Sequence, residues 1–207
     1  MHLKKSVKRK LILFGIILLV IIGVFCYFKF FNLKKAKQVK VIGEIEDYSY
    51  QLKDSKSKLY KEEFDNLKKI LTAEKIDEEK YVKSISKLFI IDFYSLSDKL
   101  AKTDVGGSDF VHSKELADFL EKAEDTIYKY VESNVYGGRK QKLPTVASVK
   151  INNVSTTSFK YLDEVDSEAF VVDVSWDYTD STGDGYQNKA TLTFVHEGKK
   201  LTLVSLE

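Results

Sequence analysis

Cysteine, proline and arginine are almost missing from this chain. Its 207 residues include one cysteine, one proline and two arginines, Arg9 and Arg139. The single cysteine, Cys26, lies in an apolar run, so the rest of the chain can form no disulfide and has no thiol for catalysis. Because arginine is a principal ligand for phosphates and base edges, its scarcity argues against a nucleic-acid partner.

Charge is missing from one long segment near the amino terminus. Residues 11 to 28 contain no charged residue and no proline, and at about 1.5 Å per residue they nearly cross a hydrocarbon core of about 30 Å. Bulky aromatic residues follow the run, so the small-x-small pattern that signal peptidase needs is missing. We therefore expect an uncleaved transmembrane anchor over residues 11 to 31, in contact with membrane lipid, after a basic tail at residues 1 to 10.

Basic residues are equally numerous on the two sides of this run. Five precede it, and five follow it between Lys29 and Lys40. The tail is almost purely positive, whereas a long carboxy-terminal domain can be translocated regardless of its charge. We therefore expect a single-pass protein of the cell membrane with a cytoplasmic amino terminus and an extracytoplasmic domain. Frequent lysine, isoleucine, tyrosine and asparagine suggest a low-GC Gram-positive bacterium.

The basic character of the chain belongs to its first 31 residues. Six of the 33 basic residues and none of the 31 acidic residues lie there, so the remainder has a net charge of about −4. A mildly acidic domain is a poor match for nucleic acid.

Three amphipathic helices are predicted after a juxtamembrane linker at residues 32–54. The linker is rich in lysine and continues as an alternating stretch from Ile45 to Leu52, which predicts a short strand or an extended connector. Apolar residues spaced by three and four predict helices over residues 56–73 and 114–132. Between them Asp77 caps a helix whose middle, residues 88–94, is apolar on nearly every face, so this helix should lie in the core.

Beyond Pro144 the apolar period changes from 3.6 to 2, which indicates β-strands. Glycine-containing turns at residues 182–185 and at Glu197-Gly198 predict that the last three strands are antiparallel neighbours. Helices followed by a strand meander predict an α+β domain over residues 55–207, with three helices packed on a curved antiparallel sheet of four to five strands. The predicted strands are residues 145–154, 158–162, 169–178, 189–196 and 199–206.

Asp92 is the one ionisable residue in the apolar middle of the second predicted helix. A desolvated carboxylate could be a catalytic acid or base, but no second catalytic group can be assigned beside it. A structural aspartate that hydrogen-bonds a tyrosine or a loop amide is the favoured interpretation. We therefore expect no enzyme, and Asp92, Tyr94 and Trp176 are the candidates for ligand binding if a cavity lies under the sheet.

Neither metals nor cofactors are indicated. The three histidines are not spaced as metal ligands. The acidic run at residues 177–185 resembles a calcium loop, but counting from Asp180 the twelfth position is Thr191 instead of glutamate. A hairpin turn that uses aspartate and glycine conformations explains the run better.

An anchor, three helices and a terminal strand meander resemble the nuclear transport factor 2-like cone fold over residues 56 to 207. The resemblance is one of element order, and it transfers no functional residue. It implies a non-catalytic scaffold that binds copies of itself and other membrane-complex proteins, as in secretion or conjugation machines of Gram-positive bacteria. Two alternatives stay open: an extracytoplasmic cone-fold domain that binds a small ligand or is an enzyme, and an envelope protein with no surrounding machine.

Overall fold

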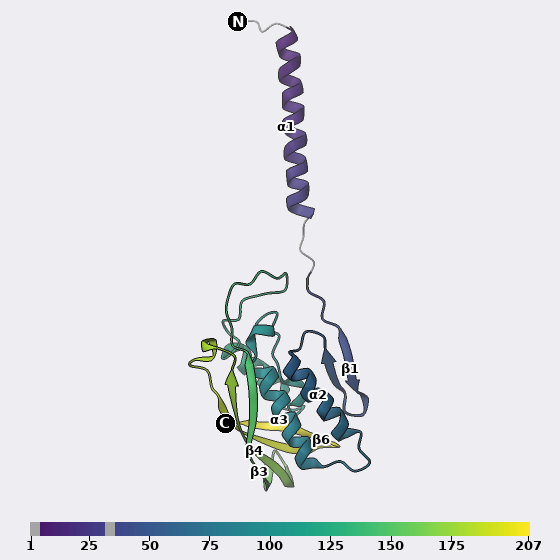
Figure 1. The fold of residues 1–207 in the computed structure, drawn as a ribbon, viewed down its shortest axis with the longest axis vertical. Coiled ribbons are helices and arrows are strands. Elements are labelled where there is room, and N and C mark those ends of the chain that lie inside the picture. Colours follow the sequence, from purple (N-terminus) through teal and green to yellow (C-terminus); the bar gives the residue numbers. More distant parts are fainter. Residues whose placement is uncertain (1–4, 32–35) are drawn as a thin grey trace. The chain divides into compact units, whose positions relative to one another are not determined.

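The structure is a computed structural model that describes residues 5–31 and 36–207. The chain divides into two compact units, residues 1–37 and residues 38–207. Figure 1 shows their helices and strands. Residues 1–4 of the predicted tail and residues 32–35 of the predicted linker lie outside the described residues.

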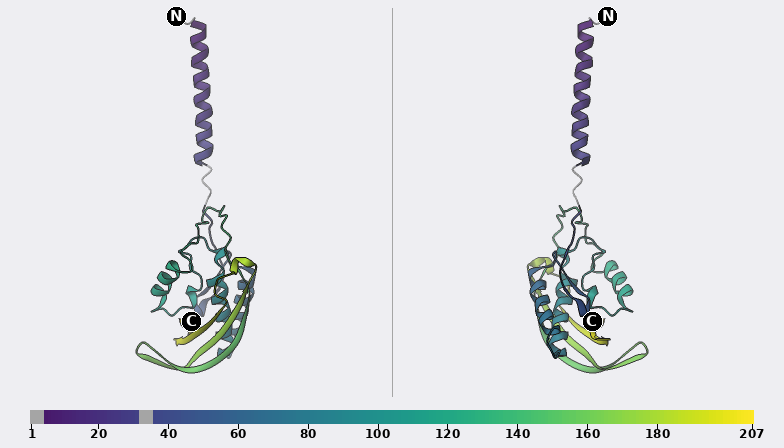
Figure 2. Two further views of the ribbon diagram at one scale, coloured as in Figure 1. Left: turned by 90° about the vertical axis from the view of Figure 1, so that its left-hand side faces the viewer. Right: turned by 90° about the vertical axis from the view of Figure 1, so that its right-hand side faces the viewer.

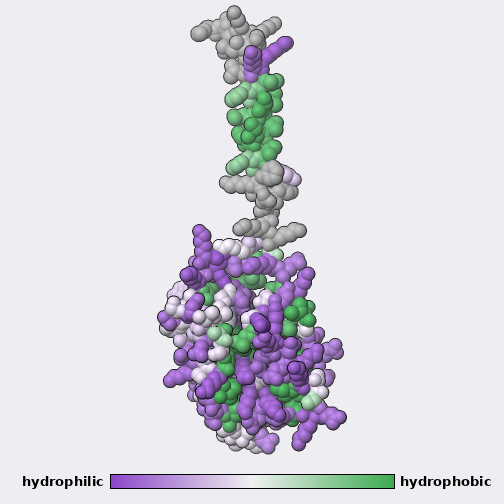
Figure 3. Space-filling view, in the orientation of Figure 1, coloured by the Kyte–Doolittle hydropathy of each residue, from purple (hydrophilic) through white to green (hydrophobic). Residues whose placement is uncertain are grey.

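The first unit contains one helix, α1, from Lys5 to Phe31. From Leu13 to Tyr27 its described side chains are apolar, and Figure 3 shows the apolar surface around its middle. Among the described residues, however, no helix is both long and apolar enough to cross a membrane. The helix is thus present, but its prediction as a transmembrane anchor over residues 11 to 31 is not supported by the structure.

The second unit is an α+β domain, as predicted, in which three helices accompany antiparallel sheets. Helix α2 (Lys58–Leu71) begins at Ser57, whose hydroxyl oxygen accepts a hydrogen bond from the Tyr60 amide. Helix α3 (Glu78–Tyr94) begins at Asp77, whose carboxylate accepts from the Lys80 amide, so the predicted cap is confirmed. Helix α3 is buried along most of its length, and it packs on α2 and on two strands of the larger sheet.

The third predicted helix is shorter than the sequence indicates. Helix α4 runs from Leu116 to Asp125, whereas the apolar stripe predicted residues 114–132. Thr126 leaves the helical region, and the Tyr128 hydroxyl is buried, where it donates to the Phe93 carbonyl at 2.6 Å. The helix therefore ends so that one tyrosine can reach a backbone oxygen in the core.

Four antiparallel strands form the larger sheet, in the order β3-β4-β5-β6. The meander is therefore confirmed, and the turn before β5 is the short 3-10 segment η4 (Ser181–Gly183). Both views in Figure 2 show the sheet curving, as predicted. The strands are β3 (Val146–Tyr161), β4 (Glu164–Tyr178), β5 (Lys189–Glu197) and β6 (Lys200–Leu206).

The β3–β4 hairpin is longer than predicted. The two strands predicted at residues 145–154 and 158–162 form one continuous strand, β3, from Val146 to Tyr161. Strand β4 begins at Glu164, five residues before the predicted start. A turn at Leu162, which has a φ of 52°, joins the two strands. Polar residues on both faces of this hairpin conceal the two-residue period on which the strand prediction depends.

A second, two-stranded sheet lies inside the segment predicted as a linker. Strands β1 (Val41–Ile45) and β2 (Tyr50–Lys53) pair through the 3-10 turn η1 (Glu46–Tyr48). Tyr50 is buried, and its hydroxyl lies 2.7 Å from that of Tyr81 on α3. Two short 3-10 segments, η2 (Leu96–Asp98) and η3 (Ser108–Phe110), complete the unit.

We predict that the β1–β2 hairpin is needed for stability. Tyr50→Ala should lower the free energy of unfolding by about 3 kcal/mol, because it removes a fully buried ring and its hydrogen bond. Denaturant unfolding measures the change. Val41→Ala on the exposed part of β1 is the matched control and should change little; equal small effects at both positions would mean that the hairpin is only a linker.

Candidate binding groove and the Asp92 cluster

Asp92 lies at the centre of a group of charges, here called the Asp92 cluster: Lys56, Asp92, Asp98 and Lys99. Asp92 and Lys99 are buried, and the other two side chains are partly buried. One carboxylate oxygen of Asp92 accepts from Lys56 at 2.5 Å and from Lys99 at 2.7 Å. Lys99 also lies 2.8 Å from Asp98. Because two ammonium groups are matched by two carboxylates, the cluster is neutral and can stay buried.

Charge, more than burial, decides how Asp92 ionises. Burial alone would raise the pKa of its carboxyl, but the ammonium groups of Lys99 and Lys56 reverse this effect and hold the pKa well below its ordinary value. Burial would lower the pKa of Lys99, yet the carboxylates of Asp92 and Asp98 raise it. Asp92 is therefore a stable anion at neutral pH and is poorly suited to act as a general acid or base.

The other Asp92 oxygen holds the glycine pair of the loop after α3. It accepts a hydrogen bond from the Gly107 amide at 2.9 Å. A Cβ on Gly106 would lie 2.2 Å from the Asp92 carbonyl oxygen, so the loop passes too close for a side chain. The Gly106 amide donates to the Tyr128 hydroxyl at 3.0 Å. These contacts support the favoured interpretation of Asp92 as a structural residue that binds a loop amide.

Tyr94 and Trp176 lie together, but away from the Asp92 cluster. Their rings are 4.4 Å apart between centroids, and both side chains are buried under the sheet. The Tyr94 hydroxyl donates to Gln187 at 2.9 Å. The two aromatic candidates therefore fill space under the sheet where a cavity was possible. Of the three predicted ligand-binding residues, only Tyr94 lines a groove, which lies between α4 and β6.

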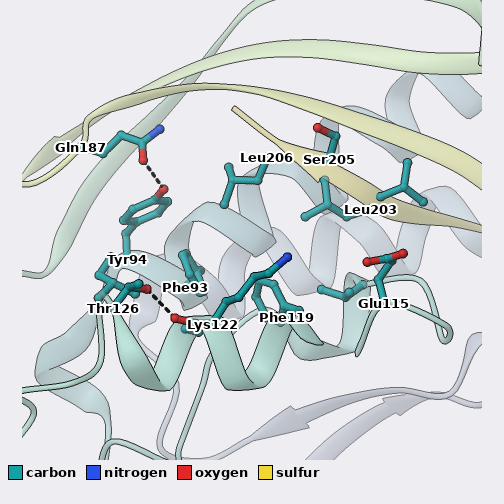
Figure 4. A pocket seen from close by; sticks show the side chains of 14 residues that line it. Phe93, Tyr94, Glu115, Phe119, Lys122, Thr126, Gln187, Leu203, Ser205 and Leu206 are labelled. Carbon is teal, nitrogen blue, oxygen red and sulfur yellow. Dashed lines mark hydrogen bonds between the residues drawn. The ribbon is translucent and has the colours of Figure 1, made fainter. Parts of the chain in front are cut away.

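A groove of about 350 Å³ lies between α4 and β6, here called the α4–β6 groove (Figure 4). Apolar side chains form its floor, and polar side chains lie along its rim. Figure 4 shows Lys122 reaching from α4 toward the strand, and Glu115 lies farther along the helix. The lining residues used below are Phe93, Val111, Phe119, Ile127, Leu203 and Leu206 for the floor, and Glu115, Lys122, Gln187 and Ser205 for the rim.

The strand side of the groove is the outer edge of the sheet, because β6 pairs only with β5 in the strand order. Thr193 pairs with Ser205 but Phe194 pairs with Leu203, so β6 has one extra residue at Val204. Beyond it, both backbone groups of Glu207 bond to Thr191. Since successive residues alternate, the amide and carbonyl of Leu206 point away from β5.

Other charged and imidazole groups lie outside the groove. His196 lies 2.8 Å from Asp166, and the His112 ring packs on Tyr161 with centroids 4.6 Å apart. Among the described residues, no group of three or more histidine, cysteine, aspartate or glutamate side chains is placed to bind a metal ion. In the acidic run, Asp180 accepts from the Thr182 amide and Gly185 has a φ of 84°, as a hairpin turn requires.

No protein-family model matches the chain, and no characterised protein or solved structure shows significant similarity to it. The resemblance to the cone fold therefore stays a prediction. Functional conclusions depend on the geometry of the groove and on the composition of the chain.

The groove is not evident from the sequence. Phe119 and Ile127 belong to the apolar stripe of the third predicted helix, and Leu206 ends the last predicted strand, so periodicity assigns all three to the core. One signal was available: the last strand of a meander is an edge strand unless the chain or a partner covers it.

We predict that Asp92→Asn destabilises the fold by about 3 kcal/mol, because the buried ammonium of Lys99 and the partly buried ammonium of Lys56 would face an uncharged amide. Denaturant unfolding at pH 7 measures this change. Lys58→Gln removes a charge that is 90% exposed and is the control. An unaltered free energy of unfolding in Asp92→Asn would mean that the cluster does not hold the loop.

The lowered pKa of Asp92 also predicts how the stability difference between the wild type and Asp92→Asn changes with pH. Since the folded pKa of Asp92 is lowered, its contribution is complete above the unfolded value of about 4 and is lost as the pH falls through the folded pKa. The difference in stability between wild type and Asp92→Asn should therefore be constant from about pH 5 to 8 and shrink below about pH 4. A difference that grows on acidification would contradict the assignment of the charge.

Proposed function

We propose that this protein is a membrane-anchored interaction domain without catalytic activity. The observation that carries the proposal is the α4–β6 groove, in which an apolar floor lies beside a strand edge that no described strand pairs with from Val204 to Leu206. Apolar surface and unpaired backbone groups are what a protein partner can cover. The stable ion pairing of Asp92 supports the non-catalytic part of the proposal, because it removes the strongest candidate for acid or base chemistry.

The anchor is the second part of the proposal and is supported by the sequence of α1. Residues 11 to 28 are uncharged, and large apolar side chains from Leu13 to Tyr27 are exposed on the helix. Basic residues precede the run, which favours a cytoplasmic amino terminus at the cell membrane. In this arrangement residues 11 to 31 contact lipid, and residues 38–207 lie outside the cytoplasm.

The resemblance to cone-fold domains extends the proposal to a class of assembly. An anchored domain of this kind would serve as a scaffold that forms homo-oligomers and binds other proteins of a secretion or conjugation complex. The order of three helices and a curved meander supports this assignment. A mildly acidic domain with one arginine supports protein partners over nucleic acid.

A small-ligand site is the second candidate function. The groove volume of about 350 Å³ lies in the range of ligand pockets, and Tyr94 and Gln187 supply polar groups at one end. In this alternative the domain would bind an extracytoplasmic small molecule or act on it. Asp92 and Trp176 do not line the groove, which weakens the prediction of a ligand site formed by Asp92, Tyr94 and Trp176.

Topology can be tested with single cysteines in a Cys26→Ser background. Tyr130→Cys places a thiol at a position that is 76% exposed, and Ser6→Cys places one in the tail. In intact cells a membrane-impermeant maleimide should label Tyr130→Cys alone, and Ser6→Cys should react only after permeabilisation. Labelling with the opposite pattern, or release of the whole chain from membranes by alkaline carbonate, would contradict the anchored arrangement.

The interaction function can be tested by photo-crosslinking in the cells that produce the protein. Benzoylphenylalanine at Lys122, on the groove rim, should give discrete adducts identified by mass spectrometry as a second copy or another membrane protein. The same group at the exposed Lys58 on α2 is the control and should give few. Adducts at neither position, with a monomeric protein, would contradict an interaction domain.

A further inference from the structure

We propose that the α4–β6 groove binds an extended peptide segment of a partner protein, which adds to the edge of β6 as a further strand. This inference rests on the proposed interaction function and names the surface and the chemistry of its partner. The groove has a strand edge on one side and a helix on the other, the arrangement in which extended peptides dock by main-chain pairing.

The unpaired backbone of β6 is the first reason for an extended partner. The amide and carbonyl of Leu206 point away from β5, while those of Glu207 are used by Thr191. Leu206 also lines the groove, so these backbone groups lie on its strand side. Only another extended backbone supplies a donor and an acceptor at the spacing of this edge; a helix uses its own backbone groups internally.

The chain already uses the neighbouring part of the same edge. Val111 forms a parallel bridge with Leu203, and the His112 amide donates to the Leu203 carbonyl at 2.9 Å. This short contact shows that an extended segment fits between β6 and the start of α4. The chain then turns into α4, so the edge from Val204 to Leu206 continues a ladder that the protein itself begins.

The side chains of the groove define what the peptide should carry. Phe119 and Ile127 are half-buried and line the groove together with Leu206, so they offer apolar contacts to alternate residues of an extended segment. Lys122 reaches across the opening and has no ion-pair partner in the part of the chain that the structure describes. The preferred segment should therefore alternate apolar residues and include a carboxylate near Lys122.

The test uses a phage-displayed library of random nine-residue peptides, selected against the full chain in lipid nanodiscs. Enriched peptides should alternate apolar residues and carry aspartate or glutamate. In synthetic copies, methylation of single backbone nitrogens should weaken binding about tenfold at alternate positions and little at the positions between them. Lys122→Glu should weaken binding of the acidic peptide about tenfold, and the control Lys58→Glu should not.

Two variants at one position separate strand addition from simple apolar contact. Leu206→Pro removes an amide that β5 does not use, so the fold should persist while peptide binding is lost. Leu206→Ala keeps the amide and should bind the peptide more tightly than Leu206→Pro by about tenfold. Circular dichroism and thermal melting confirm that both variants fold.

Three outcomes would overturn the inference: no enriched peptide, equal binding by Leu206→Pro and Leu206→Ala, or no effect of backbone methylation. Each can occur while photo-crosslinks at Lys122 identify a partner, in which case the interaction function stands and strand addition fails. Absence of those crosslinks would instead count against the proposed function itself.

Discussion

The buried carboxylate of Asp92 holds together three separate segments of the chain. Lys56 precedes α2, Lys99 follows α3, and the Gly107 amide belongs to the loop beyond, and all three donate to this one side chain. A buried charge lowers stability unless it is paired. The Asp92 carboxylate can therefore stay buried only while these donors remain in place. Removal of the Asp92 carboxylate would take a partner from all three segments at once, and it would leave Lys99 with Asp98 alone.

The groove depends on this constraint through a short stretch of chain. Gly107, held by Asp92, lies four residues before Val111, which is placed against Leu203 of β6. The chain then enters α4, and Tyr128 beyond it returns to the core to bond Phe93 and Gly106. Helix α4 is therefore fixed at both ends relative to the sheet edge. The separation between helix and strand, and hence the groove, follows from interactions made around Asp92.

Caps, apolar spacing and turn residues predicted much of this fold, because these features depend on interactions between residues close together in the sequence. Asp77 as a cap, the apolar face of α3 and the antiparallel meander all follow from spacing along the chain. The length of α4 did not follow, since it is set by a hydroxyl on Tyr128 that reaches across the core. Nor did the pairing of Asp92 with Lys56 and Lys99, because sequence gives no register between a loop lysine and a distant helix. The groove lies where such long-range contacts meet, which explains why residue periodicity assigned its lining to the core.

If a partner covers the β6 edge in the cell, the backbone amides of this edge should be protected from hydrogen exchange there. The full chain would be compared in membranes of the cells that produce it and after purification in detergent, with exchange followed by mass spectrometry. Segments spanning Val204 to Leu206 and the groove face of α4 should exchange more slowly in the native membrane, while the Gly107 amide should be slow in both preparations. Equal exchange at Val204 to Leu206 in the two preparations would contradict coverage of the β6 edge by a partner.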